Sequence, residues 1–346
     1  MLDRNVQNLK EIPQLSKLYR KQVIKALPGV AGKRVIDDPP IVYRVEGVHI
    51  DPEHLAAYCQ AVGFRLGNEV PVTYPYALAF PLAVKVMDSP GFPFPAMGIV
   101  HLSNKIEQFR PLHVEDAFTI DVHAENLRSH RKGLVLDMIT SIYVEGILVW
   151  QQTSAFLGPK AHFSSSTPAD VQVRPEAARF LPQPEKPAPG VTAIATLRFS
   201  PETVKTYAAA SGDKNPIHTS QLGAKAFGFP NTIAHGMFTH AKMLTAFEGR
   251  LPDAVRVQAD FYKPVILPAT TALFKQKEGS GWNAQLRQAK NVEKLHVAVN
   301  VEPAHYSKCW CCGATTSGFG VYFPRSSRRT PACSHSALSS AVFGVN

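Results

Sequence analysis

An internal repeat is the feature of this sequence that most constrains its fold. The segment DPEHLAAYCQAVGF, residues 51–64, resembles SPETVKTYAAASGD, residues 200–213, in its placement of proline, glutamate, tyrosine and glycine. Each segment begins with a residue that favours a helix N-cap, continues with proline and an acid in the first turn, and reaches glycine where the helix would end. This repeat predicts two copies of one structural unit.

The segments around each copy are also similar. An apolar run precedes each short helix, an apolar segment of helical character follows it, and several alternating apolar runs come next. Such runs, rich in β-branched residues and separated by turn residues, indicate antiparallel strands. Each half is therefore expected to contain a strand, a short helix, a long helix and an antiparallel meander, an α+β unit whose sheet could wrap a helix.

These patterns predict five segments. They are an N-terminal, partly helical extension (1–38), a first repeat (39–163), a linker (164–190), a second repeat (191–302) and a C-terminal tail (303–346). The linker is rich in Ser, Pro and Ala, as expected of a surface connection. The tail has no Asp or Glu and holds four of the five cysteines. Its C-x-C-C run lacks the two-residue spacers of common zinc sites, so a disordered extension is favoured.

Composition narrows the function only slightly. The formal net charge of +10 suits a polyanionic partner, but the basic residues are scattered along the chain. Nucleic-acid binding would instead favour a basic stripe interleaved with aromatic residues. The N-terminus lacks the apolar region of a secretory signal, and no apolar run is long enough to span a bilayer. We therefore expect a cytoplasmic protein with no membrane span and no nucleic-acid partner.

The densest group of chemically useful residues is SGDKNPIH, residues 211–218. A turn after Gly212 would bring Asp213 and His218 to one small cavity. A carboxylate and an imidazole that share one water can act as a general acid/base pair. Taken singly, however, Asp213 and Asn215 are common turn formers, and His218 could be a structural histidine.

The whole string resembles the signature S-G-D-x-N-P-[aliphatic]-H of the (R)-specific enoyl-CoA hydratases and the MaoC-like acyl dehydratases. The similarity continues in FGFPNTIAHGMFTHAKML, residues 227–244, and in FYKPVILPA, residues 261–269. The resemblance implies a hot-dog fold, in which an antiparallel sheet wraps a long helix. With two repeats, the expected fold is an α+β double hot dog within one chain.

The resemblance also implies roles for individual residues. Asp213 and His218 would hold and activate a water, and Asn215 would contact the substrate. The backbone N–H of Gly236, at the start of the hot-dog helix, would polarise the thioester carbonyl. Glycine permits a ligand to approach closely, and a helix N-terminus stabilises negative charge. Close packing against the sheet is the alternative role for Gly236, and His235 is expected to be structural.

The first repeat departs from this signature. Phe64 and Glu69 stand at the positions of the acid and the histidine, and no counterpart of residues 219–231 follows them. This repeat is therefore expected to be catalytically silent and, as in the double hot-dog dehydratases that it resembles, to enlarge the acyl pocket. The candidate lining residues are Phe64, Phe80, Phe92 and Phe94, with ordinary core packing as the alternative for each.

The expected function is reversible hydration of trans-2-enoyl thioesters, or dehydration of (R)-3-hydroxyacyl thioesters, in fatty-acid metabolism. The resemblance implies coenzyme A or acyl carrier protein as the carrier, and no metal or other cofactor. Two alternatives are a double hot dog that binds an acyl ligand without turnover and a hot-dog thioesterase. The repeats would form a pseudo-dimer within one chain, and a homodimer is left open.

Overall fold

The computed structural model describes residues 4–16, 18, 36–95, 98–175, 178–304, 307–308 and 315–316. The chain divides into two units, Met1–Ala304 and His305–Asn346. In the second unit, the described residues form two short strands, β12 (Ser307–Lys308) and β13 (Thr315–Thr316), which pair antiparallel. The rest of the predicted cysteine-rich tail lies outside the described residues.

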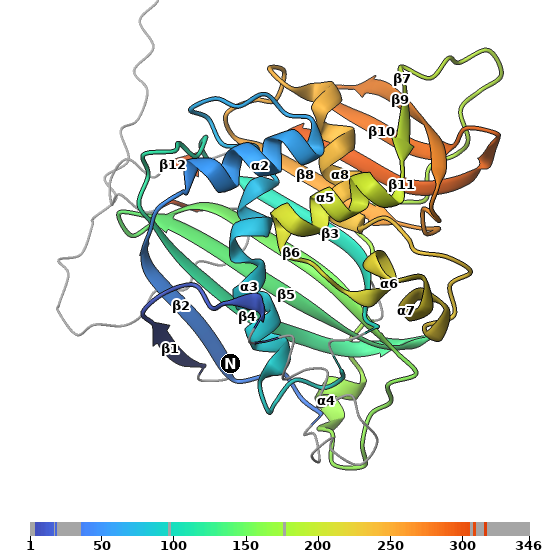
Figure 1. The fold of residues 1–346 in the computed structure, drawn as a ribbon. Helices are drawn as coiled ribbons and strands as arrows, with labels where there is room; N and C mark the ends of the chain where they lie inside the picture. The colour runs from blue at the N-terminus through green and yellow to red at the C-terminus, as the bar shows by residue number, and fades with distance from the viewer. Residues whose placement is uncertain are drawn as a thin grey trace, which may run out of the picture. The chain divides into compact units, whose positions relative to one another are not determined.

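The first half of the first unit follows the predicted order of strand, short helix, long helix and meander (Figure 1). Its elements are β1 (Asn5–Leu9), β2 (Ile41–Val48), α2 (Pro52–Val62), α3 (Tyr74–Asp88), β3 (Val100–Gln108), β4 (Phe118–His130), β5 (Gly133–Val144), β6 (Ile147–Pro159) and α4 (Ala169–Gln172). Strand β1 lies in the segment predicted as a partly helical extension. It pairs in parallel with β2.

The second half repeats this order and adds two short helices. Its elements are β7 (Ala195–Phe199), α5 (Pro201–Ser211), α6 (Pro216–Thr219), α7 (Gln221–Ala226), α8 (Gly236–Leu244), the 3-10 helix η1 (Thr245–Phe247), β8 (Val255–Phe261), β9 (Ala269–Glu278), β10 (Gly281–Gln288) and β11 (Asn291–Pro303). Helices α6 and α7 form the segment that the first half lacks. No helix in the described part of the chain combines the length and apolar character that a bilayer crossing requires.

The strands of both halves form one sheet in the order β1-β2-β4-β5-β6-β3-β8-β11-β10-β9-β7. The strands β3, β6, β5, β4 and β2 of the first half correspond in order to β8, β11, β10, β9 and β7 of the second half. Strands β3 and β8 join the halves as an antiparallel pair, with Ile106 opposite Val257. In each half the long helix contacts strands of its own half, α3 on β2, β4 and β5 and α8 on β11. The predicted double hot-dog fold is confirmed.

The repeated short helices begin and end as the sequence predicts. The side chains of Asp51 and Ser200 cap α2 and α5 by accepting hydrogen bonds from backbone N–H groups of the first turn, at 2.9 and 3.3 Å. Gly63 and Gly212 end these helices with φ of 101° and 74°. Glycine adopts this left-handed conformation without strain. Local sequence thus determines where the chain leaves α5.

Buried charges attach the segment between the halves to the second half. The Asp260 carboxylate, which has no exposed surface, accepts hydrogen bonds from the N–H groups of Phe180 and Leu181, both at 3.0 Å. The buried Arg287 guanidinium donates to the carbonyls of Pro184 and Glu185. Buried charges are stable only when they are hydrogen-bonded. These contacts therefore hold part of the predicted linker against the sheet.

Four of the described histidines have strongly lowered pKa values. Burial is the largest cause that lowers the pKa of each, to about 3 for His101, His218 and His240 and to about 4 for His235. His240, in α8, has no exposed surface, and among the described residues neither of its ring nitrogens has a hydrogen-bond partner. All four rings are therefore uncharged at neutral pH.

These histidines predict an acid-sensitive fold. An unfolded histidine takes up a proton near pH 6.5, whereas folded His240 does so only near pH 3. Between these values the unfolded state binds more protons, so the free energy of unfolding falls as pH falls, by about 1.4 kcal/mol per pH unit for each such group.

The variant His240→Leu should therefore reduce the slope of unfolding free energy against pH by about one proton between roughly pH 4 and 6. Urea unfolding across this range measures the slope. The same substitution at the exposed His49 is the control. An unchanged slope in His240→Leu would contradict the prediction, whatever the absolute stability of the variant.

Candidate active site

The turn between α5 and α6 carries Asp213. Its Oδ1 accepts a hydrogen bond from the N–H of Asn215 at 3.2 Å, and the Asn215 side chain caps α6 by accepting from the N–H of Ile217. Asp and Asn favour such turns because their side chains bond to nearby backbone groups. The turn leads directly into α6, which carries His218.

One hydrogen bond sets the orientation of His218. Its Nδ1 lies 2.8 Å from the carbonyl oxygen of Ile233. A carbonyl can only accept, so Nδ1 carries the proton and Nε2 keeps its lone pair. His218 is therefore able to accept a proton at Nε2.

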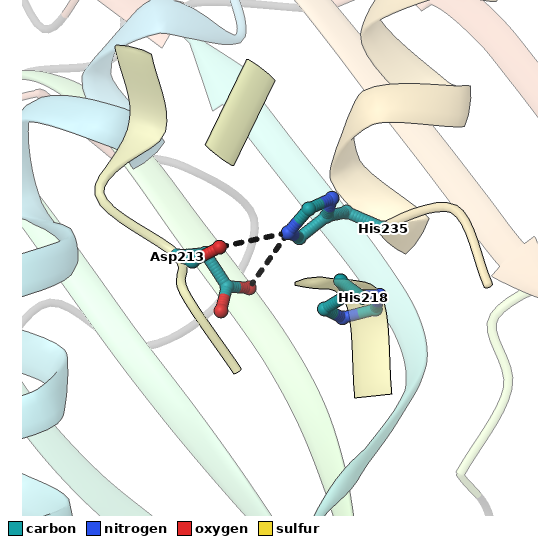
Figure 2. Close-up of side chains that lie close together, drawn as sticks. All are labelled: Asp213, His218 and His235. Atoms are coloured by element: carbon teal, nitrogen blue, oxygen red, sulfur yellow. Dashed lines mark hydrogen bonds and ion pairs between the residues drawn. The ribbon is translucent and has the colours of Figure 1, made fainter. Parts of the chain in front are cut away.

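His235, which the sequence predicted to be structural, lies against both residues of the predicted pair. Its ring stacks on that of His218, with centroids 3.7 Å apart and an interplanar angle of 28°. Its Nε2 lies 2.9 Å from the backbone oxygen of Asp213 and 4.0 Å from the carboxylate Oδ2 (Figure 2). The sequence places His235 directly before Gly236, but it does not reveal that this helix start lies beside the turn of Asp213.

The three side chains are close enough to share a water. One nitrogen or carboxylate oxygen from each of Asp213, His218 and His235 lies within 4.8 Å of the others. A single water can bridge two polar atoms at such a separation, because each hydrogen bond spans about 2.8 Å. The structure therefore brings the predicted acid and imidazole together in a geometry suited to proton transfer.

Gly236 begins α8 next to this group. Backbone N–H groups in the first turn of a helix have no acceptor within the helix. A Cβ at this position would lie 3.2 Å from the ring of Phe261, which is tighter than ordinary contact. Both predicted roles, ligand approach and close packing, are therefore compatible with the position of this glycine.

A cavity of about 1040 Å³ contains Asp213, His218, His235 and Gly236 in its wall. Both halves of the chain contribute to it. Buried apolar side chains of α3 and β6 form the wall from the first half: Tyr76, Phe80, Val84, Met87, Phe156 and Leu157. The volume is sufficient for a large organic ligand.

Of the four phenylalanines predicted to line an acyl pocket, Phe80 lines this cavity. Phe92 and Phe94 are buried elsewhere and pack edge to face, with ring centroids 5.1 Å apart. Phe64 is half-buried and packs against the hydrophobic core. These three are not among the described residues of the cavity wall. Phe64, Phe92 and Phe94 instead pack with other apolar residues, which is the alternative role that the sequence analysis gave for each of them.

The exposed part of the cavity wall is cationic. It includes Arg131, Lys132, Arg179, Lys214 and Lys263. Asp213 is the one acidic residue among the described residues that line the cavity. Charges of one sign at the opening of a cleft attract a ligand of the opposite sign.

Known proteins are similar to this chain in sequence and in fold. Residues 182–301 match the family described as the MaoC like domain. The 3-hydroxyacyl-thioester dehydratase X of Mycobacterium tuberculosis is 44% identical over 256 residues, which cover 74% of this chain and 87% of that protein. The chain belongs to the MaoC-like dehydratase family.

A solved structure and a second relative agree with this assignment. The crystal structure of HtdX from Mycobacterium tuberculosis matches with a TM-score of 0.66 and 40% identity, and covers 76% of this chain and 99% of that one. The peroxisomal enoyl-CoA hydratase 2 of Arabidopsis thaliana is 28% identical over 198 residues, which cover 54% of this chain and 62% of that protein. The segment that matches the MaoC family includes every residue of the Asp213, His218 and His235 group.

Burial shifts the pKa values of the acid and the imidazole in this MaoC-like site in opposite directions. Desolvation raises the pKa of Asp213 above its usual value, and His218 and the N–H of Asn215 partly oppose that rise. Desolvation, followed by the neighbouring His235, lowers the pKa of His218 to about 3. Both shifts have the same cause, because burial disfavours the charged form of each group.

The group also has the residue types of a metal site, since carboxylate and imidazole are common ligands. However, the Nε2 of His235 donates to the carbonyl of Asp213, and the Nδ1 of His218 donates to Ile233. Neither nitrogen therefore has a free lone pair. Lone pairs remain on the Asp213 carboxylate, on the His218 Nε2 and on the His235 Nδ1, and the last of these lies on the side of its ring away from Asp213 (Figure 2). This arrangement favours a proton-transfer pair over a three-ligand metal site.

We expect Asp213→Asn to leave the free energy of unfolding at neutral pH unchanged or to raise it. The amide removes the cost of burying a charge and keeps the Oδ1 that accepts from Asn215. Urea or thermal unfolding measures the effect. The control is Asp137→Asn, where loss of the charge breaks a buried pair with Arg128 and should destabilise the fold by about 3–5 kcal/mol. A similar loss in Asp213→Asn would make Asp213 a structural residue.

Proposed function

We propose that this protein is a hydro-lyase that reversibly hydrates trans-2-enoyl thioesters and dehydrates (R)-3-hydroxyacyl thioesters. The observation that carries the proposal is the Asp213–His218 pair, with its free imidazole lone pair, in one cavity with the N-terminus of α8. The relatives named 3-hydroxyacyl-thioester dehydratase and enoyl-CoA hydratase support it.

In the proposed reaction, Asp213 and His218 hold one water beside the double bond. The water oxygen bonds to the β-carbon, and the pair accepts one water proton. The pair returns a proton to the α-carbon on the same face, so one water is added and the two side chains regain their starting charges. Positioned acid and base groups commonly contribute about 10²–10⁴-fold to the rate.

Negative charge develops on the thioester oxygen during this addition. The start of α8 offers the N–H of Gly236 and the positive end of the helix dipole to that oxygen. One such donor typically contributes about 2.7–4 kcal/mol. The first turn of α8 therefore completes the proposed site with a group that acts mainly on the enolate-like transition state.

The wall of the cavity fits an acyl thioester in two ways. The exposed cationic residues suit the phosphate groups that both coenzyme A and the phosphopantetheine arm of acyl carrier protein possess. The buried apolar residues of α3 and β6 suit the acyl chain. We propose that the first half serves as the acyl-binding wall and that the second half carries the chemistry.

A thioesterase of this fold would need a carboxylate placed for hydrolysis, usually on the long helix. The sequence of α8, GMFTHAKML, has no acid, and Asp213 is the one acidic residue among the described residues of the cavity wall. Hydration is therefore the better proposal, and the assay below distinguishes the two reactions.

Asp213→Asn and His218→Ala should each reduce kcat for hydration of crotonyl-CoA by at least about 100-fold while the protein stays folded. Loss of the conjugated enoyl absorbance reports hydration, and release of free thiol reports hydrolysis. Glu69→Gln, at the corresponding exposed position of the first half, is the control and should retain turnover. Near wild-type hydration in either site variant would refute the proposal. Thiol release without hydration would favour a thioesterase, and binding without either reaction would favour a ligand-binding protein.

Substrates with acyl chains of increasing length should test the proposed acyl-binding wall. Val84 is buried and lines the cavity from α3. Each buried methylene contributes about 0.8 kcal/mol, or about fourfold in kcat/KM, until the chain reaches the end of the cavity. Val84→Trp should therefore lower kcat/KM for long enoyl thioesters but not for crotonyl, on coenzyme A and on acyl carrier protein alike.

The control for this experiment is Leu78→Trp, which makes the same kind of change on α3 away from the cavity wall. It should change kcat/KM equally for all chain lengths. If wild-type kcat/KM already falls steeply beyond crotonyl, the first half closes the pocket and the proposed acyl-binding role is wrong.

A further inference from the structure

His235 contacts both residues of the proposed catalytic pair, and the proposed reaction gives it no task. It precedes the first residue of α8 and is 2% exposed. Its Nε2 is hydrogen-bonded at 2.9 Å to the backbone oxygen of Asp213, and its ring lies 3.7 Å from that of His218, centroid to centroid. Figure 2 shows these rings side by side with the Asp213 carboxylate next to them.

The hydrogen bonds give the two stacked rings opposite tautomers. His218 is protonated at Nδ1 because it donates to the carbonyl of Ile233, whereas His235 is protonated at Nε2 because it donates to the carbonyl of Asp213. The Nδ1 of His235 is buried and has no hydrogen-bond partner among the described residues. His235 is therefore a neutral donor aimed at the backbone of Asp213.

The buried His240 differs from His235 in this respect. His240 lies on the same helix, has no hydrogen-bond partner at either nitrogen among the described residues, and is absent from the described cavity wall. A histidine that only filled space would not need a donor directed at the carbonyl of a catalytic residue. The contacts of His235 thus distinguish it from core packing.

We propose that His235 is a positioning residue that holds both members of the catalytic pair. Its Nε2–H fixes the turn that carries Asp213, and its ring prevents the imidazole of His218 from rotating away from the shared water. This inference rests on the proposed function, since it assigns His235 a role in that reaction.

The neutral state of His235 is part of this role. Burial lowers its pKa to about 4, partly opposed by the bond to Asp213. The titratable groups that contact it are Asp213, His218 and Tyr207, whose ring centroid lies 5.2 Å away. A cation at this position would make it harder for His218 to accept a proton. A neutral donor orients the pair without that penalty.

The test compares His235→Phe, which keeps an aromatic ring but loses the donor, with His235→Gln, whose amide N–H can replace Nε2–H. A displacement of catalytic groups by about 1 Å can cost about 100-fold in rate. We therefore expect His235→Phe to lower kcat by about 10–100-fold with KM changed less than about threefold. His235→Gln should recover most of that loss.

The control is His240→Leu, which removes a buried imidazole from α8 outside the cavity wall and should keep kcat near the wild-type value. Thermal unfolding of each variant separates a loss of fold from a loss of positioning. Full activity in His235→Phe would overturn the inference. So would equal losses of kcat in His235→Phe and His235→Gln, or a loss of kcat that follows the loss of thermal stability in all three variants.

A second measurement uses the wild-type protein and does not depend on any variant folding. Nitrogen-15 NMR of histidine-labelled protein at neutral pH should show His235 protonated at Nε2 and His218 at Nδ1, both neutral. The opposite tautomer or a charged ring at His235 would overturn the inference. Failure of the proposed function is a separate result, seen as retained hydration in Asp213→Asn and His218→Ala.

Discussion

The antiparallel pairing of β3 with β8 is the contact on which the active site depends. It joins the sheets of the two halves, with Ile106 opposite Val257. The same strands supply His101 and Phe261 to the cavity wall, and these rings lie 4.9 Å apart. This pairing, together with the contacts of α2 and α3 with α5, holds the apolar wall of α3 and β6 near the turn that carries Asp213.

Burial is the largest cause that shifts the pKa values of the proposed catalytic pair. Removing the carboxylate and the imidazole from water disfavours their charged forms, which raises the pKa of Asp213 and lowers that of His218. The same effect makes the buried histidines a source of acid sensitivity in the fold.

The two halves have the same fold and different chemistry. The first half lacks the counterpart of α6 and α7, the segment that carries His218 in the second half. Its α3 instead presents apolar side chains to the cavity of the second half. The strand order is the same in both halves although only the second half has this segment, so the sheet does not depend on it.

Several parts of this structure followed from local sequence. The helix caps at Asp51 and Ser200, the glycine ends of α2 and α5 and the turn of Asp213 all depend on neighbouring residues along the chain. The meanders followed from alternating apolar runs, and the repeat predicted two equivalent units. The signature string named the acid and the histidine that the structure brings together.

The sequence by itself determined the repeated α+β unit, because apolar periodicity and short-range hydrogen bonds specify it, and its resemblance to a family signature pointed to Asp213 and His218 as the proposed acid/base pair. Only the tertiary structure decided which distant side chains complete the site. It placed His235 against Asp213 and His218, and Phe80 in the cavity wall, while Phe92 and Phe94 pack in the core. The physical reason is that the neighbours of a side chain depend on strand pairing and helix packing between segments far apart in the chain. Local sequence spacing does not specify that pairing and packing.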